Sequence, residues 1–270
     1  MKFWKMQGCG NDFIIIDNRT EKRTEEELAE LAKKYCSRRL SIGADGLMAV
    51  EGSDTADFRM RFFNSDGTVG EMCGNGARCI ARYGYETGLS GLHQRIETTA
   101  GLVTAERITE REYRVRLNLP TVLEPHRESE GYDCGYAELG SPGLPHAVVQ
   151  MEDWDSMETD TLRELGRRLR WSAAFPKGAN VTFVKKLGEE HYRVRTFERG
   201  VEDFTLACGT GCGSTVSVLT ARGLSAGRGV RLESDGGTLT VDVIREQGRI
   251  CELLLQGPTC IVAKGETVDE

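Results

Sequence analysis

A short cysteine motif occurs twice in the chain, and this repeat constrains the fold more than any other feature of the sequence. Cys73-Gly74-Asn75-Gly76 lies in the first half and Cys208-Gly209-Thr210-Gly211 in the second, 135 positions apart in a chain of 270 residues. The repeat continues downstream, because a Gly-Leu-Ser sequence follows 15 residues after each cysteine, at 88–90 and at 223–225. Self-similarity at half the chain length predicts two equivalent half-domains, each presenting one cysteine.

The pattern of predicted elements indicates an α/β (α+β) fold in which strands outnumber helices and each half has about one long helix. We expect residues 1–120 to form the first half-domain and residues 121–259 the second, with the tail from about 260 to 270 returning to the first. The chain is expected to cross between the halves in the polar stretch 120–130, where the hydrophobic periodicity is lost.

Helix starts are the clearest local signals in the sequence. Thr24 and Glu27 have the spacing of a capping box, which predicts a helix N-terminus there. Thr159 or Thr161 is expected to cap a second helix that extends to Trp171. A further helix should follow each cysteine motif, so both cysteines are expected at a turn that leads into a helix N-terminus.

Composition indicates a globular protein and argues against two classes of partner. Charged residues make up 29% of the chain and hydrophobic residues 39%. The net charge of −7 argues against nucleic acid and acidic membranes as partners. No run approaches the roughly 20 apolar residues of a membrane span, and residues 1–17 lack the pattern of a signal peptide. We therefore expect a cytoplasmic protein.

The chain has nine cysteines, but neither their number nor their spacing predicts disulfides or a metal site. An odd count without a secretion signal argues against a disulfide framework. The close pairs are C-x5-C at 73 and 79 and C-x3-C at 208 and 212, and neither is the C-x2-C of structural zinc sites. We expect no metal and expect most of the cysteines to be small buried side chains.

Two cysteines at helix N-termini suit proton transfer at carbon. A helix N-terminus favours the thiolate, and the glycines after each cysteine let backbone N–H groups approach an anion closely. A substrate carboxylate held between two such turns would place its α-carbon between two sulfurs. One thiolate would then remove the α-proton while the opposite thiol donates a proton to the other face. This chemistry requires neither a metal nor pyridoxal phosphate (PLP).

With these residues identified, the chain resembles the diaminopimelate epimerase family over nearly its whole length. Several of the matching motifs are specific to that family and occur in the order that it requires. They are Gly10-Asn11-Asp12-Phe13, Gly43-Ala44-Asp45-Gly46, Asn64-Ser65-Asp66-Gly67, Met72-Cys73-Gly74-Asn75-Gly76-Ala77-Arg78-Cys79, Pro145-His146, Asn180-Val181, Glu198-Arg199-Gly200 and Ala207-Cys208-Gly209-Thr210-Gly211. The resemblance implies two pseudo-symmetric half-domains, each a barrel-like, mostly antiparallel sheet around a central helix, with the active site in the cleft between them.

The resemblance also implies a reaction, which is the cofactor-independent epimerisation of LL-2,6-diaminopimelate to meso-diaminopimelate in lysine and peptidoglycan precursor biosynthesis. Cys73 and Cys208 would be the two acid/base thiols, and His146 could orient or polarise a thiol. Arg78 and Cys79 are expected to be structural. The residues implied to bind substrate are Gly74, Asn75, Gly209, Thr210 and Asn11 at the reacting end, and Asn64, Asn180, Glu198 and Arg199 at the distal end. A homodimer is one assembly compatible with these expectations.

Leu144 departs from the family pattern, because an asparagine often precedes the Pro-His pair as a contact to the distal end. This departure leaves a related cofactor-independent racemase of proline, hydroxyproline or histidine as the alternative. Proline racemases, however, usually have a histidine where Asn75 stands here. A thiol redox or metal-binding protein that uses the cysteines as a switch is a third hypothesis, from a different functional class.

Overall fold

The computed structural model describes residues 1–70 and 73–268. Met72, which belongs to one of the motifs above, and the last two residues of the predicted returning tail lie outside the described residues. The chain forms two compact units. The first contains residues 1–115 and the segment from Gly257 onward, and the second contains residues 116–256.

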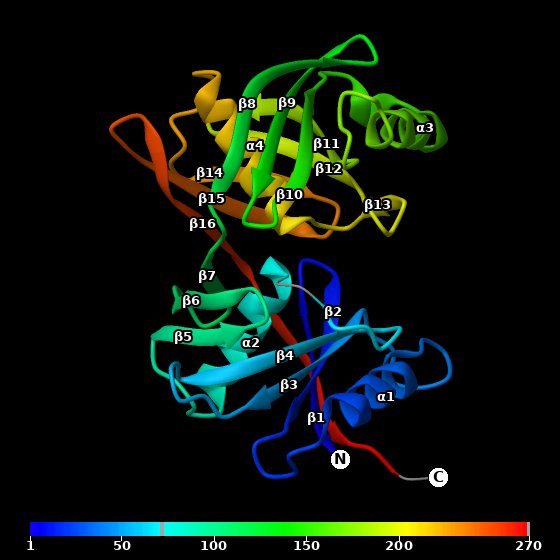
Figure 1. The fold of residues 1–270 in the computed structure, drawn as a ribbon, viewed down its shortest axis with the longest axis vertical. Helices are drawn as coiled ribbons and strands as arrows, with labels where there is room; N and C mark the ends of the chain where they lie inside the picture. The colour runs from blue at the N-terminus through cyan, green and yellow to red at the C-terminus, as the bar shows by residue number, and fades with distance from the viewer. Residues whose placement is uncertain (71–72, 269–270) are drawn as a thin grey trace. The chain divides into compact units, whose positions relative to one another are not determined.

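The first unit is a mixed sheet with two helices (Figure 1). β1 and β2 form an antiparallel hairpin, β2 runs parallel to β3, and β3 is antiparallel to β4. β4 runs parallel to β5, which forms a hairpin with β6, and β17 pairs with β1. The elements are β1 (Lys2–Gly8), β2 (Asn11–Asp17), α1 (Glu25–Cys36), β3 (Gly46–Glu51), β4 (Phe58–Asn64), α2 (Gly74–Glu86), β5 (His93–Thr98), β6 (Gly101–Arg107), β7 (Glu112–Arg116) and β17 (Cys260–Glu266).

The second unit repeats this order of pairings. β9 and β10 form an antiparallel hairpin, β10 runs parallel to β11, and β11 is antiparallel to β12. β12 runs parallel to β14, which forms a hairpin with β15. The elements are β8 (Pro120–Ser129), β9 (Tyr132–Leu139), β10 (Leu144–Gln150), η1 (Trp154–Ser156), α3 (Thr159–Arg170), β11 (Asn180–Gly188), β12 (His191–Glu198), β13 (Asp203–Thr205), α4 (Gly209–Ala221), β14 (Val230–Ser234), β15 (Gly237–Glu246) and β16 (Arg249–Pro258).

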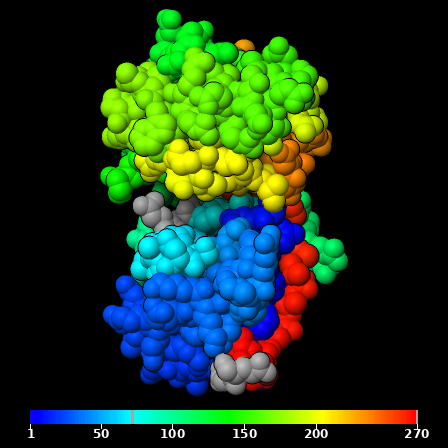
Figure 2. All heavy atoms as spheres, turned by 90° about the vertical axis from the view of Figure 1, so that its right-hand side faces the viewer, coloured from blue at the N-terminus to red at the C-terminus, as the bar shows by residue number. Residues whose placement is uncertain are grey.

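The two units are therefore pseudo-symmetric, as the cysteine repeat predicts. Each has a hairpin, a helical crossover to a parallel strand, an antiparallel strand, a second helix, and another parallel strand that enters a hairpin. Each crossover helix, α1 or α3, lies on the outside of its own unit (Figure 1), and its atoms are part of that unit's surface in Figure 2, blue for α1 and yellow-green for α3. Both cysteine motifs occupy the same topological position, after the antiparallel strand and before the second helix.

The second helix of each unit is the central one, and the sheet of that unit packs around it. α2 contacts β1, β2 and β6, while α4 contacts β8, β9, β10, β11 and β15. Most side chains of both helices are buried. Small residues allow this close packing: a Cβ built on Gly213 of α4 would lie 2.8 Å from Leu117 and 3.1 Å from Leu253. The predicted barrel-like sheet around a central helix is confirmed in each unit.

One local prediction about helix starts is confirmed and one is wrong. The capping box of Thr24 and Glu27 is present at the start of α1. The N-cap of α3 is Glu158, whose side chain makes no capping hydrogen bond, because Thr159 already has helical geometry. Most of the polar stretch 120–130, in which the sequence has no hydrophobic periodicity, forms β8, which pairs with β9 through backbone hydrogen bonds.

Candidate active site

Both cysteines are N-cap residues of the central helices, and their backbones have the same conformation. Cys73 has φ −108° and ψ 120°, and Cys208 has φ −115° and ψ 107°. The residues that follow are helical, so their backbone N–H groups have no acceptor earlier in the helix. Such a turn presents N–H donors and the positive end of the helix dipole, which together favour an anion.

The thiol of Cys73 lies against a fixed amide in the first unit. Cys73 Sγ donates to Asn11 Oδ1 at 3.2 Å. Asn11 Nδ2 in turn donates to Asp45 Oδ2 at 2.6 Å, and Arg38 holds the other oxygen of Asp45 at 2.8 Å. The amide of Asn11 is therefore oriented by a carboxylate, with its oxygen towards the sulfur.

Asn64 lies at the same edge of the sheet as Asn11. Asn11 is the first residue of β2, and Asn64 is the last residue of β4, opposite Gly46 at the start of β3. Asn64 Nδ2 donates to Thr68 Oγ1 at 2.9 Å. Asn75, in the first turn of α2, is 3% exposed, and its Oδ1 accepts from Arg78 Nη2 at 2.9 Å.

In the second unit the thiol of Cys208 belongs to a short chain of polar contacts. The backbone N–H of Gly211 donates to Cys208 Sγ at 3.3 Å, and Thr210 Oγ1 lies 3.5 Å from the same sulfur. His146 Nε2 lies 3.1 Å from Thr210 Oγ1. His146 is fully buried, and its Nδ1 has no hydrogen-bond partner within the described part of the chain.

Three further predicted residues of the second unit are linked to this chain. Asn180 Oδ1 accepts from the backbone N–H of Arg199 at 2.7 Å, and Asn180 Nδ2 lies 3.5 Å from His146 Nε2. Glu198 Oε1 accepts a hydrogen bond from Thr205, a residue of the short strand β13. Contacts therefore link His146, Asn180, Glu198, Arg199, Cys208 and Thr210 in the second unit, where Gly209 follows Cys208. In the first unit Asn11 contacts Cys73, which Gly74 follows, while Asn64 lies at the sheet edge of Asn11 and the Asn75 amide oxygen faces Arg78.

The surroundings of Cys208 keep it protonated. Burial raises the pKa of the Cys208 thiol well above its usual value, and the negative charge of Glu198 raises it further. Hydrogen bonds from Thr210 and the Gly211 N–H only partly offset this rise. The expectation that the helix N-terminus lowers the pKa of both cysteines is therefore wrong for Cys208, because desolvation outweighs the helix dipole.

The other two titratable groups of this cluster are also shifted by burial. Burial raises the pKa of Glu198, while hydrogen bonds from Thr205 and Cys208 lower it in part. Burial lowers the pKa of His146 to about 3, and the charge of Arg199 acts in the same direction. His146 is consequently a neutral imidazole at physiological pH, which can orient the Thr210 hydroxyl.

Two residues of the site were not assigned a role from the sequence. Asp45 orients Asn11, and its only sequence signal is its place in the Gly43-Ala44-Asp45-Gly46 motif. Thr205 binds Glu198 from a strand of three residues, and no pattern in the sequence marks it. Leu144, the residue that departs from the family pattern, is the first residue of β10 and is half-buried.

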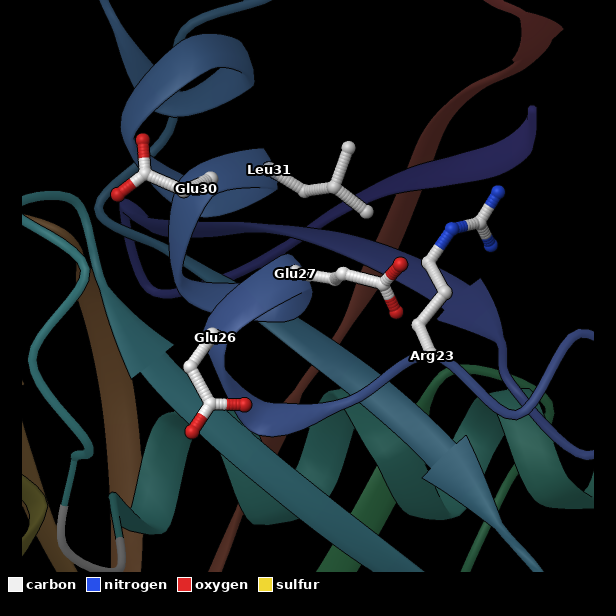
Figure 3. Close-up of a pocket in the computed structure, with 5 residues that line it drawn as sticks. All are labelled: Arg23, Glu26, Glu27, Glu30 and Leu31. Carbon is white, nitrogen blue, oxygen red and sulfur yellow. The ribbon is translucent and has the colours of Figure 1, made fainter.

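A surface hollow of about 420 Å³ on the first unit involves neither cysteine (Figure 3). Its walls are the start of α1 and the residue before the helix cap, with Glu27 and Arg23 facing each other (Figure 3). Glu27 already accepts from the Thr24 N–H at 2.7 Å as part of the capping box. Within residues 1–70 and 73–268, no group of three or more His, Cys, Asp or Glu side chains is arranged to hold a metal ion.

Comparison with known proteins identifies the family. A sequence profile described as diaminopimelate epimerase matches residues 3–120 and 140–260. The diaminopimelate epimerase of Aquifex aeolicus is 40% identical over 284 aligned positions, covering 100% of this chain and 99% of that protein. That of Methanothrix thermoacetophila is 36% identical over 282 positions, covering 100% and 97%. The chain belongs to the diaminopimelate epimerase family.

Membership of the diaminopimelate epimerase family makes the chain an isomerase, and solved structures agree on the fold. A PhzF-family phenazine biosynthesis protein from Bacillus anthracis has a TM-score of 0.75 at 17% identity, covering 100% of this chain and 99% of that one. A hydroxyproline epimerase from Agrobacterium vitis has a TM-score of 0.67 at 16% identity, covering 98% and 90%. None of the described helices has the length and hydropathy needed to cross a membrane.

Proposed function

We propose that this member of the diaminopimelate epimerase family converts LL-2,6-diaminopimelate to the meso form, with Cys73 and Cys208 as the two acid/base groups. The observation that carries the proposal is the equivalence of the two cysteines. Each is the N-cap of a buried central helix at the same topological position of its unit. Full-length relatives at 36–40% identity bear the name of this epimerase.

The proposed reaction consists of two proton transfers at one carbon. A thiolate takes the α-proton, so a C–H bond breaks and an S–H bond forms. The opposite thiol then gives its proton to the other face of the carbanion, and it is left as the thiolate. The negative charge that develops on the substrate carboxylate is stabilised by the N–H donors of residues 74–76 and 209–210. No external oxidant, cofactor or metal takes part in this balance.

The protonation of Cys208 defines the resting roles. Because the pKa of Cys208 is raised, it starts as the proton donor. Cys73 must then begin as the base, which requires that it first lose to solvent the proton that it donates to Asn11 Oδ1 in this structure. Conversion of the LL form to the meso form leaves the substrate's α-proton on Cys73. The reverse reaction begins from that state, so the same pair serves both directions.

Substrate binding divides into two sets of residues. For the reacting amino-acid end we propose Asn11, Gly74, Asn75, Gly209 and Thr210, with His146 supporting Thr210. For the distal end we propose Asn64, Asn180, Glu198 and Arg199. Arg199 suits a carboxylate, because its side chain is exposed and forms no ion pair within the described residues, while its backbone is held by Asn180.

The cellular setting and the assembly are also proposals. Thiol chemistry requires reduced cysteines, which the cytoplasm maintains. We propose a cytoplasmic enzyme that assembles as a homodimer. Light scattering behind a size-exclusion column would measure a mass near twice the 29.9 kDa of the chain if this is correct, and a mass near 29.9 kDa would contradict it.

The proposed function is tested by proton NMR in D₂O with reduced enzyme and three substrates in separate tubes, LL-diaminopimelate, L-proline and L-histidine. We expect loss of the α-proton signal and formation of the meso isomer in the first tube alone. Exchange of proline or histidine instead would favour the alternative that Leu144 raises, namely a related racemase. Lack of exchange in all three tubes, with the thiols verified as reduced, would contradict the proposal.

A further inference from the structure

A guanidinium is buried directly beneath the first turn of α2. Arg78 is fully buried. Its Nη2 donates to Asn75 Oδ1 at 2.9 Å, and its Nη1 donates to the carbonyl oxygen of Gly74 at 3.3 Å. Nη2 also lies 3.7 Å from the sulfur of Cys9, in the turn between β1 and β2. Arg78 therefore contacts two consecutive residues of the turn that Cys73 caps.

Among residues 1–70 and 73–268, no acidic side chain pairs with the charge of Arg78. Within the described part of the chain, no carboxylate lies within 4.0 Å of it, and its Nε is buried without a partner. Burial raises the pKa of Cys9, and that of Cys79 to about 12, so both neighbouring thiols stay neutral. The charge of Arg82, one turn further along α2, is already paired with Glu86 at 3.5 Å.

A buried charge without a counterion is costly, and an arginine side chain cannot lose its proton to avoid that cost. An anion at the start of α2 would reduce this cost. The thiolate of Cys73 and a substrate carboxylate are the two anions that the proposed function brings there. Packing also fixes the guanidinium, since a Cβ built on Gly8 of β1 would lie 3.4 Å from Arg78 Nη2 and 3.2 Å from the Asn75 carbonyl oxygen.

The second unit has no such charge at the equivalent place. The residue 135 positions after Arg78 is Gly213, which packs against Leu117 and Leu253. The charged group that faces Cys208 is Glu198, which is negative. A role of Arg78 in packing alone would not require a charged side chain, because an apolar contact serves at the corresponding position of α4.

We infer that Arg78 is a positioning residue of the first half-site, which orients the Asn75 amide and supplies a permanent positive charge that favours the Cys73 thiolate. This inference rests on the proposed function, because only the proposed reaction requires a thiolate at Cys73. The charge itself can be tested without any substrate.

The test measures the alkylation rate of each cysteine by iodoacetamide at pH 7.5, resolved by peptide mass spectrometry. Arg78→Met removes the positive charge, and Arg78→Gln removes the charge but keeps an N–H donor for Asn75. Arg78→Lys keeps the charge but lacks the planar guanidinium group with its two parallel donors. We expect Cys73 to react about tenfold more slowly in the Met and Gln variants, which corresponds to a change of about one pKa unit. In the Lys variant we expect a rate within about threefold of the wild type.

Two internal controls accompany the variants. Cys260 is exposed and should react at an unchanged rate throughout. Arg82→Met removes another buried arginine of α2 whose charge is already paired, and it should leave the Cys73 rate unchanged. If the Met variant does not fold, as judged by circular dichroism, the Gln and Lys variants carry the comparison.

The inference is overturned if folded Arg78→Gln alkylates Cys73 at the wild-type rate, or if Arg82→Met slows Cys73 equally. The inference is supported if the alkylation rate of Cys73 depends on the charge of residue 78. If the same enzyme does not turn over diaminopimelate, the proposed function is contradicted but the role of Arg78 is not. With substrate, Arg78→Lys should raise KM more than it lowers kcat, because the charge is kept and the hold on Asn75 is lost.

Discussion

The first turns of α2 and α4 have the same backbone, but the charged side chains around them differ among the residues that the structure describes. Each begins at a cysteine N-cap in extended geometry, followed by a glycine. Below α2 lies the buried cation of Arg78, whereas beside Cys208 lie the carboxylate of Glu198 and the neutral ring of His146. The backbone supplies the anion-binding turn twice, and in the second unit the side chains around it keep the proton on the Cys208 thiol.

The largest expected effect comes from removing either thiol. Cys73→Ala and Cys208→Ala should each lower kcat/KM for epimerisation by roughly 10³-fold or more, because each half of the proton transfer loses its only group. Thermal unfolding should be nearly unchanged, since both residues are small. Turnover of folded Cys208→Ala at the wild-type rate would remove the two-thiol mechanism.

Glu198→Gln should make Cys208 more reactive by removing the negative charge beside its thiol. Without the negative charge the pKa of Cys208 falls, so at pH 8 its alkylation by iodoacetamide should rise by about three- to tenfold, while the rate for Cys73 stays constant. Peptide mass spectrometry resolves the two sites. An unchanged or slower rate for Cys208 would show that Glu198 does not hold the proton on this sulfur.

His146 predicts an acid sensitivity specific to the second unit. Its pKa is about 3 when folded and near 6.5 when unfolded, so the unfolded chain binds more protons between these values. The free energy of unfolding should therefore decrease as the pH falls, by about 2–3 kcal/mol from this residue between pH 6.5 and pH 4.5. Urea unfolding of the wild type and His146→Gln at both values gives the difference, and equal losses in both proteins would contradict the assignment.

The smallest expected effect is on the free energy of unfolding, and the N-caps of the two crossover helices provide a matched pair of variants to measure it. α1 has a capping box at Thr24, whereas α3 begins at Glu158 without a side-chain cap. Thr24→Ala should lower the free energy of unfolding by about 1 kcal/mol, and Glu158→Ser should raise it by a few tenths to about 1 kcal/mol. Urea denaturation measures both, and a loss of stability in Glu158→Ser would contradict this account of α3.

The cysteine repeat predicts the backbone structure of the site, because local motifs determine both the N-cap position of each cysteine and the pseudo-symmetric topology. It could not predict the protonation of Cys208, since this depends on burial and on Glu198, which reaches the sulfur only through the pairing of β12 with β13. The sequence predicts a structural role for Arg78, because it does not reveal that no carboxylate of the described residues pairs with this guanidinium. β8 has no signal in the sequence, because a strand of polar residues lacks hydrophobic periodicity.

The most direct test of two opposed thiols is the early isotope content of substrate and product when LL-diaminopimelate is epimerised in D₂O. A two-base reaction takes the substrate proton on one sulfur and delivers solvent deuterium from the other. We therefore predict that the first meso product carries deuterium at the inverted carbon, while the remaining LL substrate keeps its proton. Deuterium entering unreacted substrate as fast as product, or product that retains the substrate proton, would mean that a single base serves both faces and would contradict the account.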